Sequence, residues 1–358
     1  MKPPAELVRE AIRQRKLYTL PRGKYIAKLN QNENPYEVPD SIKEEILREI
    51  KRKSWNRYPD LAYSELKEEI AEWQKVAKER IIIGNGSNEV LFSIMFTLLS
   101  KGDELVSISP SFSMFENFSS LIETRTTYLR LKKGNFSFPV EDIEERAASG
   151  KYKLILLCSP NNPTGNTLSR DELVRILESA KGYVLVDEAY VDFCNQDFKK
   201  LIDDYDNLIL TRTFSKAFSF PFGRFGYGIL PVELAREVVK AQLPYNLNGM
   251  TETAVRVLIK NRKVFGEILE KIIKEREKLF VELNKIPGIK PYLSSSNFIL
   301  IKTVFDSQLL YAQLMKRGIL IRDVSYYPGL KNHLRITVGK PQENQILIET
   351  MNEIVKGL

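Results

Sequence analysis

Short apolar runs alternate with helix-length segments between about residues 81 and 230 of this 358-residue chain. Such a rhythm is typical of a parallel sheet covered by helices on both faces. We therefore predict an α/β fold whose large domain holds a mostly parallel sheet of roughly seven strands. The predicted strands are Ile81–Ile83, Leu105–Ile108, Thr127–Leu131, Lys153–Cys158, Tyr183–Val186, Leu208–Thr211 and Gly226–Leu230, and the helices between them include Val90–Ser100, Phe112–Ile122 and Arg170–Ala180.

The pattern changes in the last third of the chain. Helical periodicity runs almost continuously from Thr251 to about Asn284, which is long enough to join two domains. After it, the segments Asn297–Lys302, Ile319–Arg322 and His333–Val338 are predicted strands, and Ser307–Arg317 and Glu343–Val355 are predicted helices. We expect an N-terminal arm that is part of a smaller α/β domain (1–35), a large cofactor-binding domain (36–255) and a small C-terminal domain (256–358).

Composition excludes several classes of protein. Apolar residues make up 43% and charged residues 28% of the chain, as in soluble globular proteins. No apolar run reaches the roughly 20 residues of a membrane span. The net charge of +8 comes from Lys and Arg interleaved with Glu, which is typical of helix surfaces. We therefore expect neither a membrane nor a nucleic-acid partner.

The scarcity of cysteine and histidine limits the chemistry further. Cys158 and Cys194 are too few for a disulfide framework, so we expect a cytoplasmic protein. His333 is the only histidine, which argues against a multi-histidine zinc site and against a Ser-His-Asp triad. We expect no metal, and we expect a lysine or a cofactor to carry any reaction.

Polar or glycine-rich turns follow four of the predicted strands. They are GNGSNEV (84–90), SPNNPTG (159–165), DEAY (187–190) and TRTFSKAFSFPFGRFG (211–226). Ligands of such sheets bind just beyond the carboxyl ends of the strands. These four turns therefore predict one site.

Lys216 lies in the last of these turns among Phe214, Phe218, Phe220 and Phe222. Burial among aromatic rings lowers the pKa of a lysine and frees its amine to form a Schiff base. The alternative is a basic loop whose aromatic rings point away from the lysine.

The other turns offer groups that complement a reactive amine. Two glycines and a capping-type Ser87 at a helix start favour an anion. Asp187 follows an apolar strand, so its buried carboxylate needs either an arginine or a protonated ring nitrogen as a partner. The side chains suited to a ring oxygen or to a phosphate group are Asn162, Tyr190, Thr213, Ser215 and Arg224. A phosphate, a pyridinium and an aldehyde that captures Lys216 together describe pyridoxal 5′-phosphate.

The chain also resembles the fold-type-I, class I/II aminotransferases from about residue 18 to 345. The motifs that carry the resemblance are LNQNENPY (29–36), NRYPD (56–60), GNGSNEVL (84–91), PSFSMF (110–115), CSPNNPTGN (158–166), VLVDEAYVDF (184–193), RTFSKAF (212–218), GRFGY (223–227), LPYNLN (243–248) and HLRITVGK (333–340). The most specific are SPNNPTG, the Asp187/Tyr190 pair, and SKAF followed by Arg224.

The resemblance assigns roles to these residues. Lys216, Asp187 and Tyr190 are the expected catalytic residues: the lysine forms the Schiff base and moves a proton, the aspartate pairs with the pyridine nitrogen, and the tyrosine binds the ring 3′-oxygen. The expected cofactor-binding residues are Ser87, Asn88, Phe112, Asn162, Asp187, Tyr190, Thr213, Ser215, Lys216 and Arg224, together with Tyr58, which would reach the neighbouring site of a homodimer.

Arginines are expected at the substrate end of the site. By the resemblance, Arg335, Arg322 and Asn162 bind the substrate, and an N-terminal tyrosine, either Tyr18 or Tyr25, contacts it as well. The expected reaction is transamination between histidinol phosphate and 2-oxoglutarate in histidine biosynthesis. The alternatives are an aromatic amino acid aminotransferase, a threonine-phosphate decarboxylase, and a regulator that binds the cofactor without catalysis.

Overall fold

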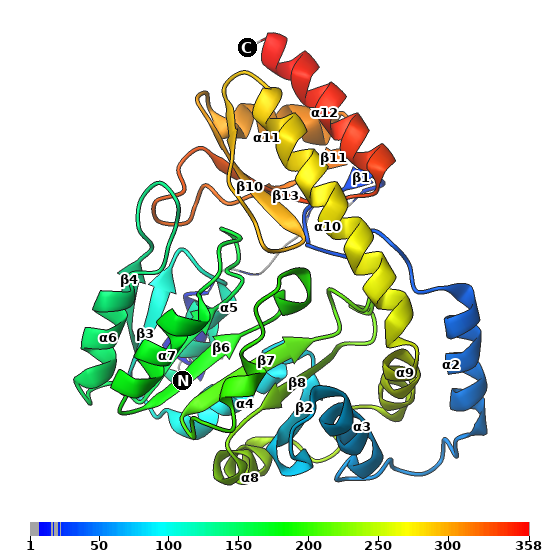
Figure 1. The fold of residues 1–358 in the computed structure, drawn as a ribbon, viewed down its shortest axis with the longest axis vertical. Helices are drawn as coiled ribbons and strands as arrows, with labels where there is room; N and C mark the ends of the chain where they lie inside the picture. Colours follow the sequence, from blue (N-terminus) through cyan, green and yellow to red (C-terminus); the bar gives the residue numbers. More distant parts are fainter. Residues whose placement is uncertain (1–6, 16, 18–20, 22, 358) are drawn as a thin grey trace.

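A computed structural model describes residues 7–15, 17, 21 and 23–357 of the chain, and Figure 1 shows one large sheet with two smaller sheets above it. The large sheet has seven strands in the order β2-β8-β7-β6-β5-β3-β4. Of these strands only β8 runs opposite to the rest, so the predicted mostly parallel α/β sheet is confirmed. The strands are β2 Ile81–Asn85, β3 Glu104–Ser109, β4 Arg125–Arg130, β5 Leu154–Cys158, β6 Tyr183–Asp187, β7 Leu208–Thr213 and β8 Phe225–Ile229.

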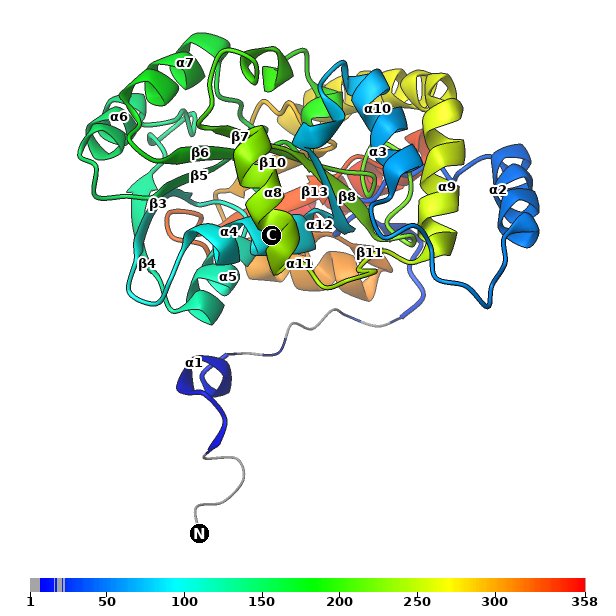
Figure 2. The same ribbon diagram turned by 90° about the horizontal axis from the view of Figure 1, so that it is seen from below.

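Helices cover both faces of this sheet, as Figure 2 shows. Alternate residues of a strand point to opposite faces. Leu154 and Leu156 of β5 therefore pack with α4 (Ser87–Leu98), α5 (Met114–Ile122) and α8 (Val232–Ala241). Ile155 and Leu157 belong to the larger apolar cluster on the other face. The helices of that cluster include α3 Ser64–Gln74, α6 Val140–Ala148 and α7 Arg170–Ser179.

The two smaller sheets combine both ends of the chain. One is antiparallel, in the order β12-β13-β10-β9, and the other pairs β1 in parallel with β11. Helix α10 (yellow in Figure 1) extends from beside α9 to these sheets. The elements are β1 Ala27–Lys28, β9 Ile289–Pro291, β10 Phe298–Thr303, β11 Ile319–Leu320, β12 Arg322–Asp323, β13 His333–Thr337, α9 Gly249–Lys260, α10 Arg262–Lys285, α11 Ser307–Lys316 and α12 Pro341–Lys356.

The remaining elements are short or peripheral. They are α1 Glu10–Arg13, α2 Asp40–Arg52 and the 3₁₀ helices η2 Lys78–Arg80, η3 Val191–Phe193 and η4 Phe198–Leu201. Within the described ranges, no helix is long and apolar enough to cross a membrane.

Two predicted elements are wrong in their extent. The long helix over 251–284 is interrupted at Asn261, whose side chain donates hydrogen bonds to the Val257 carbonyl at 2.9 Å and to Glu45 at 3.1 Å. The predicted strand Ile319–Arg322 is divided between two sheets: its first two residues pair with β1, and Arg322 pairs with Arg335 of β13. Strand β1 lies at the other end of the chain, so the local pattern does not contain this pairing.

Candidate active site

A cavity of about 560 Å³ lies at the carboxyl ends of the large-sheet strands, beneath the small sheets. Twelve of the predicted site residues line it. These residues are Ser87, Asn88, Phe112, Asn162, Asp187, Tyr190, Thr213, Ser215, Lys216, Arg224, Arg322 and Arg335. Four strand-end turns and the small antiparallel sheet thus contribute to one space.

The start of helix α4 forms one end of the cavity. The residue that caps this helix is Gly86 (φ +83°), not Ser87 as the sequence suggested, and a glycine has no side chain with which to cap it. A Cβ on Gly86 would approach the Arg224 Nη2 to 2.7 Å, so the glycine lets the guanidinium lie against the helix start. Arg224 also donates to the Ser215 hydroxyl at 3.2 Å. Free helical N–H groups beside an arginine form an anion site.

Gly226 of β8 is required for the same close packing. A Cβ there would lie 2.1 Å from the Ser87 backbone nitrogen. The strand can therefore pass directly behind the helix start only without a side chain at this position.

Lys216 lines the cavity. Its Nζ donates to the Gln31 carbonyl at 2.9 Å and lies 5.9 Å from the centre of the Tyr190 ring. Burial, reinforced by the nearby positive charge of Arg335, lowers the pKa of Lys216 from 10.5 to about 7. A large fraction of this amine is therefore neutral, and nucleophilic, near neutral pH.

The phenylalanines of the lysine loop contribute differently from our prediction. Phe214 and Phe218 stack on each other with ring centres 4.2 Å apart, and both meet the edge of Trp73 in the core beyond the loop. Phe222 is 95% exposed. None of the four phenylalanines lines the cavity, and burial is the main cause of the low pKa of the amine.

Asp187 ends strand β6 at the floor of the cavity and is 2% exposed. It accepts a hydrogen bond from the Thr211 hydroxyl at 3.0 Å. Burial raises the pKa of this carboxyl from 3.8 to about 7. The buried arginine on the next strand, Arg212, binds Glu188 at 2.8 Å and Asp197 at 2.6 Å instead. Arg212, the nearby arginine that could have paired with Asp187, therefore pairs with Glu188 and Asp197. Asp187 is left able to pair with a cation in the cavity.

Arg335 and Arg322 lie side by side at the opposite end. They are directly paired residues of β13 and β12, so their side chains leave the same face of the sheet. Arg335 is 8% exposed and donates to Asn162 Oδ1 at 2.6 Å and to the Asn30 carbonyl at 2.7 Å. Its Nε is buried and has no hydrogen-bond partner among the described residues. Because an unsatisfied buried donor is costly, this atom is suited to an anionic group of a ligand.

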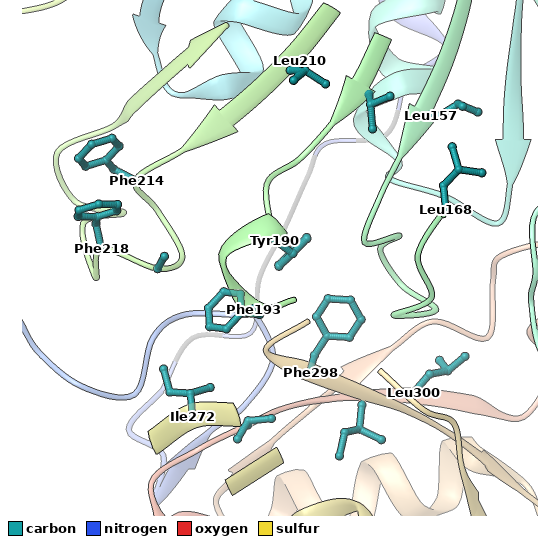
Figure 3. Close-up of a cluster of buried hydrophobic side chains, with 14 of the residues drawn as sticks. Leu157, Leu168, Tyr190, Phe193, Leu210, Phe214, Phe218, Ile272, Phe298 and Leu300 are labelled. Carbon is teal, nitrogen blue, oxygen red and sulfur yellow. The ribbon is translucent and has the colours of Figure 1, made fainter. Parts of the chain in front are cut away.

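An apolar cluster beside the cavity joins the large and small sheets (Figure 3). The edge of the Tyr190 ring meets Phe298 of β10, with ring centres 5.2 Å apart. Phe298 also lies beneath the Arg335 guanidinium, 5.3 Å from its Cζ. Phe298 therefore contacts both Tyr190 and Arg335.

Three residues without a predicted role, Asn30, Gln31 and Asn32, also line the cavity. They bind Arg335, Lys216 and Tyr190 respectively. Two of these contacts use backbone carbonyls, which leave no mark on the sequence. The sequence signal for these contacts is the LNQNENPY motif (29–36), in which several amide side chains follow strand β1.

Tyr58 and Tyr25 do not line this cavity, and for Tyr58 the predicted contact is with the neighbouring site of a homodimer. Tyr58 is 78% exposed and stacks on Tyr245 at 4.5 Å, next to a separate cavity of about 810 Å³. Tyr18 lies outside the described residues. Tyr25 is partly buried and is not one of the residues that line the site.

The residues present suit pyridoxal phosphate. Arg224 and the free N–H groups of α4 form a cradle for its phosphate, and Gly86 and Gly226 leave room for Arg224 and for strand β8 to pack against the helix start. The raised pKa of Asp187 suits a carboxyl that shares a proton with a ring nitrogen. A partly neutral Lys216 suits an amine that attacks an aldehyde.

Comparisons with known proteins agree with this arrangement. Residues 24–351 match the family model described as aminotransferase class I and II. The histidinol-phosphate aminotransferase of Thermoanaerobacter pseudethanolicus is 37% identical over 350 residues, which cover 98% of this chain and 99% of that protein.

Solved structures share the fold over almost the whole chain. The histidinol-phosphate aminotransferase from Clostridium acetobutylicum superposes with a TM-score of 0.86 at 27% identity and covers 93% of this chain and 100% of that one. The corresponding enzyme from Sinorhizobium meliloti, solved in complex with pyridoxal-5′-phosphate, gives a TM-score of 0.88 at 21% identity and covers 98% of each chain.

Proposed function

Because the chain belongs to the aminotransferase class I and II family, we propose that it transfers an amino group between histidinol phosphate and 2-oxoglutarate, giving imidazole-acetol phosphate and glutamate. The family implies dependence on pyridoxal phosphate. When bound, this cofactor supplies a ring that absorbs the electron pair left when the α-C–H bond of the substrate is broken.

The side chains at the strand ends divide the work of binding and proton transfer. Arg224, with the helix start at Ser87 and Asn88, holds the phosphate. Asp187 holds a proton at the ring nitrogen, which makes the ring a better acceptor of electrons. Lys216 would carry the proton from the α-carbon of the substrate to the carbon of the cofactor that bore the aldehyde, because its amine can gain and lose a proton near neutral pH.

The remaining cofactor contacts orient the ring. Phe112 lies on the cavity wall, where its ring can stack on the pyridine. Asn162 Oδ1 accepts a hydrogen bond from Arg335, so the amide N–H groups of Asn162 can donate to the ring oxygen. Thr213 and Ser215 complete the phosphate end.

Two paired arginines determine the substrate specificity in this proposal. The unpartnered buried Nε of Arg335, with Arg322 directly beside it, forms a dicationic end of the cavity. A phosphate dianion engages two arginines, whereas one bidentate arginine satisfies a carboxylate. The amine donor thus carries a phosphate, and a 2-oxo acid uses Arg335.

We further propose a cytoplasmic homodimer. Cys158 and Cys194 are both free. Three exposed apolar side chains, Trp55, Tyr58 and Met250, line the second cavity. Phe222 in the lysine loop and Leu243 are exposed as well. Exposed apolar clusters such as that around the second cavity mark protein interfaces, and a partner there would bring its Tyr58 to the cofactor phosphate.

A substrate comparison tests the proposal. The purified protein should have a higher kcat/KM for histidinol phosphate than for histidinol, histidine or phenylalanine. Arg322→Ala should lower kcat/KM for histidinol phosphate by at least about 30-fold, since removing one partner of a desolvated charge pair costs roughly 2–5 kcal/mol. The loss with glutamate should be smaller.

Arg317→Ala is a matched control, because Arg317 contacts the surface residue Glu353. Equal losses for both substrates in Arg322→Ala would contradict a phosphate pocket. Faster turnover of phenylalanine would instead indicate an aromatic amino acid aminotransferase, and release of CO₂ from threonine phosphate would indicate the decarboxylase.

A further inference from the structure

Asn32 connects the small antiparallel sheet to the Tyr190 hydroxyl. Its side-chain Nδ2 donates to the Tyr190 oxygen at 2.8 Å. Its backbone N–H donates to the Thr337 hydroxyl at 2.9 Å, and its carbonyl accepts from Asn297 Nδ2 at 3.0 Å. Asn32 is 1% exposed, so water does not compete for these bonds. Hydrogen bonds therefore fix Asn32 to Thr337 of β13 and to Asn297, which directly precedes β10.

The backbone of Asn32 has a left-handed conformation, with φ of 53°. Glycine, asparagine and aspartate adopt this region more readily than other residues. The Thr337 hydroxyl also donates to Asn32 Oδ1 at 3.2 Å. This contact directs the amide oxygen towards β13 and leaves the amide nitrogen facing Tyr190.

We propose that Asn32 is a positioning residue that fixes the direction in which Tyr190 donates its hydroxyl proton. An amide N–H group can only donate, so the Tyr190 oxygen accepts from Asn32 and cannot donate back to it. The Tyr190 hydroxyl then points its proton into the cavity, where it can donate a hydrogen bond to the 3′-oxygen of the cofactor ring. This inference rests on the proposed cofactor and adds a residue that acts on it through Tyr190.

The surroundings of Tyr190 support this polarity. The charged or titratable groups that face it are Lys216, Arg335, Asp187 and Cys158. Burial raises the pKa of Tyr190 to about 12, although the bond from Asn32 opposes the rise. The hydroxyl therefore keeps its proton near neutral pH and is available as a donor.

Two variants test the inference in the cofactor-loaded protein. Asn32→Gly removes the amide and still accommodates the left-handed backbone, and Asn32→Asp replaces the donor with an acceptor of the same shape. The measurement is the pH midpoint at which the visible absorption band changes. A hydrogen bond to the ring 3′-oxygen favours its deprotonated form, so weakening the bond should raise the midpoint by about one pH unit. Asn32→Asp should shift it at least as far, because a carboxylate attracts the Tyr190 proton to itself.

Matched variants separate this effect from a general change of charge. Asn207→Asp also loses an amide donor, which binds the Leu177 carbonyl before strand β7, and it should leave the midpoint unchanged. In a Tyr190→Phe background, neither Asn32 variant should shift the midpoint further.

Some outcomes would overturn the inference. A midpoint within about 0.2 pH units of the parent in both Asn32 variants would do so, since losing a hydrogen bond to a charged group shifts a pKa by more than this. A full shift that persists without the Tyr190 hydroxyl would do so as well. If the parent protein shows no visible band with pyridoxal phosphate, the proposed function fails instead.

Discussion

Single residues in this site owe their chemistry to where the fold buries them. Asp187 and Lys216 both have a pKa of about 7, although one is an acid and the other a base. Burial disfavours the charged form of each, which raises the first pKa and lowers the second. A bound ring that is protonated at one end and linked to an amine at the other would relieve both costs.

Asp187→Asn should separate this electronic role from a structural one. The amide keeps the shape of the side chain but cannot stabilise a pyridinium. We expect kcat to fall by about 10²–10³, a typical loss for an electrostatic contact at developing charge. Folding, followed by circular dichroism, should be retained. A near-normal kcat would show that the ring nitrogen lies elsewhere.

The pH dependence of stability provides a second readout of the same substitution. In the cofactor-free protein, Asp187 titrates at about 7 when folded and near 3.9 when unfolded. Between these values the folded state holds the extra proton, so the contribution of Asp187 to the free energy of unfolding falls as the pH rises from about 4 to 7. Asparagine does not titrate. Between pH 5 and 8 the variant should therefore gain roughly 3 kcal/mol relative to the parent. A constant difference in denaturant melts would contradict the raised pKa.

At the scale of elements, the start of helix α4 is the part most sensitive to a small substitution. Gly86→Ala should lower cofactor affinity at least about tenfold, because the new Cβ meets the Arg224 guanidinium and displaces it from the phosphate end. Gly102→Ala is the control: φ is +87° there, but no atom lies within 4 Å of the added Cβ. The control should lose about 1–2 kcal/mol of stability from backbone strain and keep its cofactor affinity. Fluorescence titration with pyridoxal phosphate distinguishes the two, and equal affinities would contradict the cradle.

The elements also show how far a sequence can be interpreted by its local pattern. The central strands of the large sheet were predictable because both of their faces are buried, which makes continuous apolar runs such as LILLC in β5. The strand-end turns were predictable because parallel strands bring their carboxyl ends together. The split of Ile319–Arg322 was not, since it depends on pairing with β1 at the other end of the chain.

Within the site, a contact could be predicted when a side chain makes it and not when a backbone atom makes it. Side chains with distinctive chemistry, such as Lys216 and Arg335, could be identified from their motifs. The contacts of Asn30 and Gln31 use backbone carbonyls, which any residue possesses. The role of Phe222 was misjudged because the sequence does not show that its ring points into solvent.

At the scale of the whole molecule, the exposed aromatic surface predicts association. Phe222 is 95% exposed and directly follows Pro221, which lines the cavity. Sedimentation velocity should show a dimer for the parent protein, and Phe222→Asp should weaken it at least about tenfold, since burying a charge in an apolar interface is costly. Val304→Asp, at an apolar residue 83% exposed on another part of the chain, should leave the dimer intact. A monomeric parent with full activity would contradict a shared site.

The most direct test of the account is to locate the lysine that binds the cofactor. The protein loaded with pyridoxal phosphate should be yellow, and borohydride should bleach it and fix one pyridoxyl group per chain. Peptide mapping by mass spectrometry should place that group on Lys216, and Lys216→Ala should neither be labelled nor turn over substrate. A label on any other lysine, or turnover by Lys216→Ala, would contradict the assignment of this cavity as the active site.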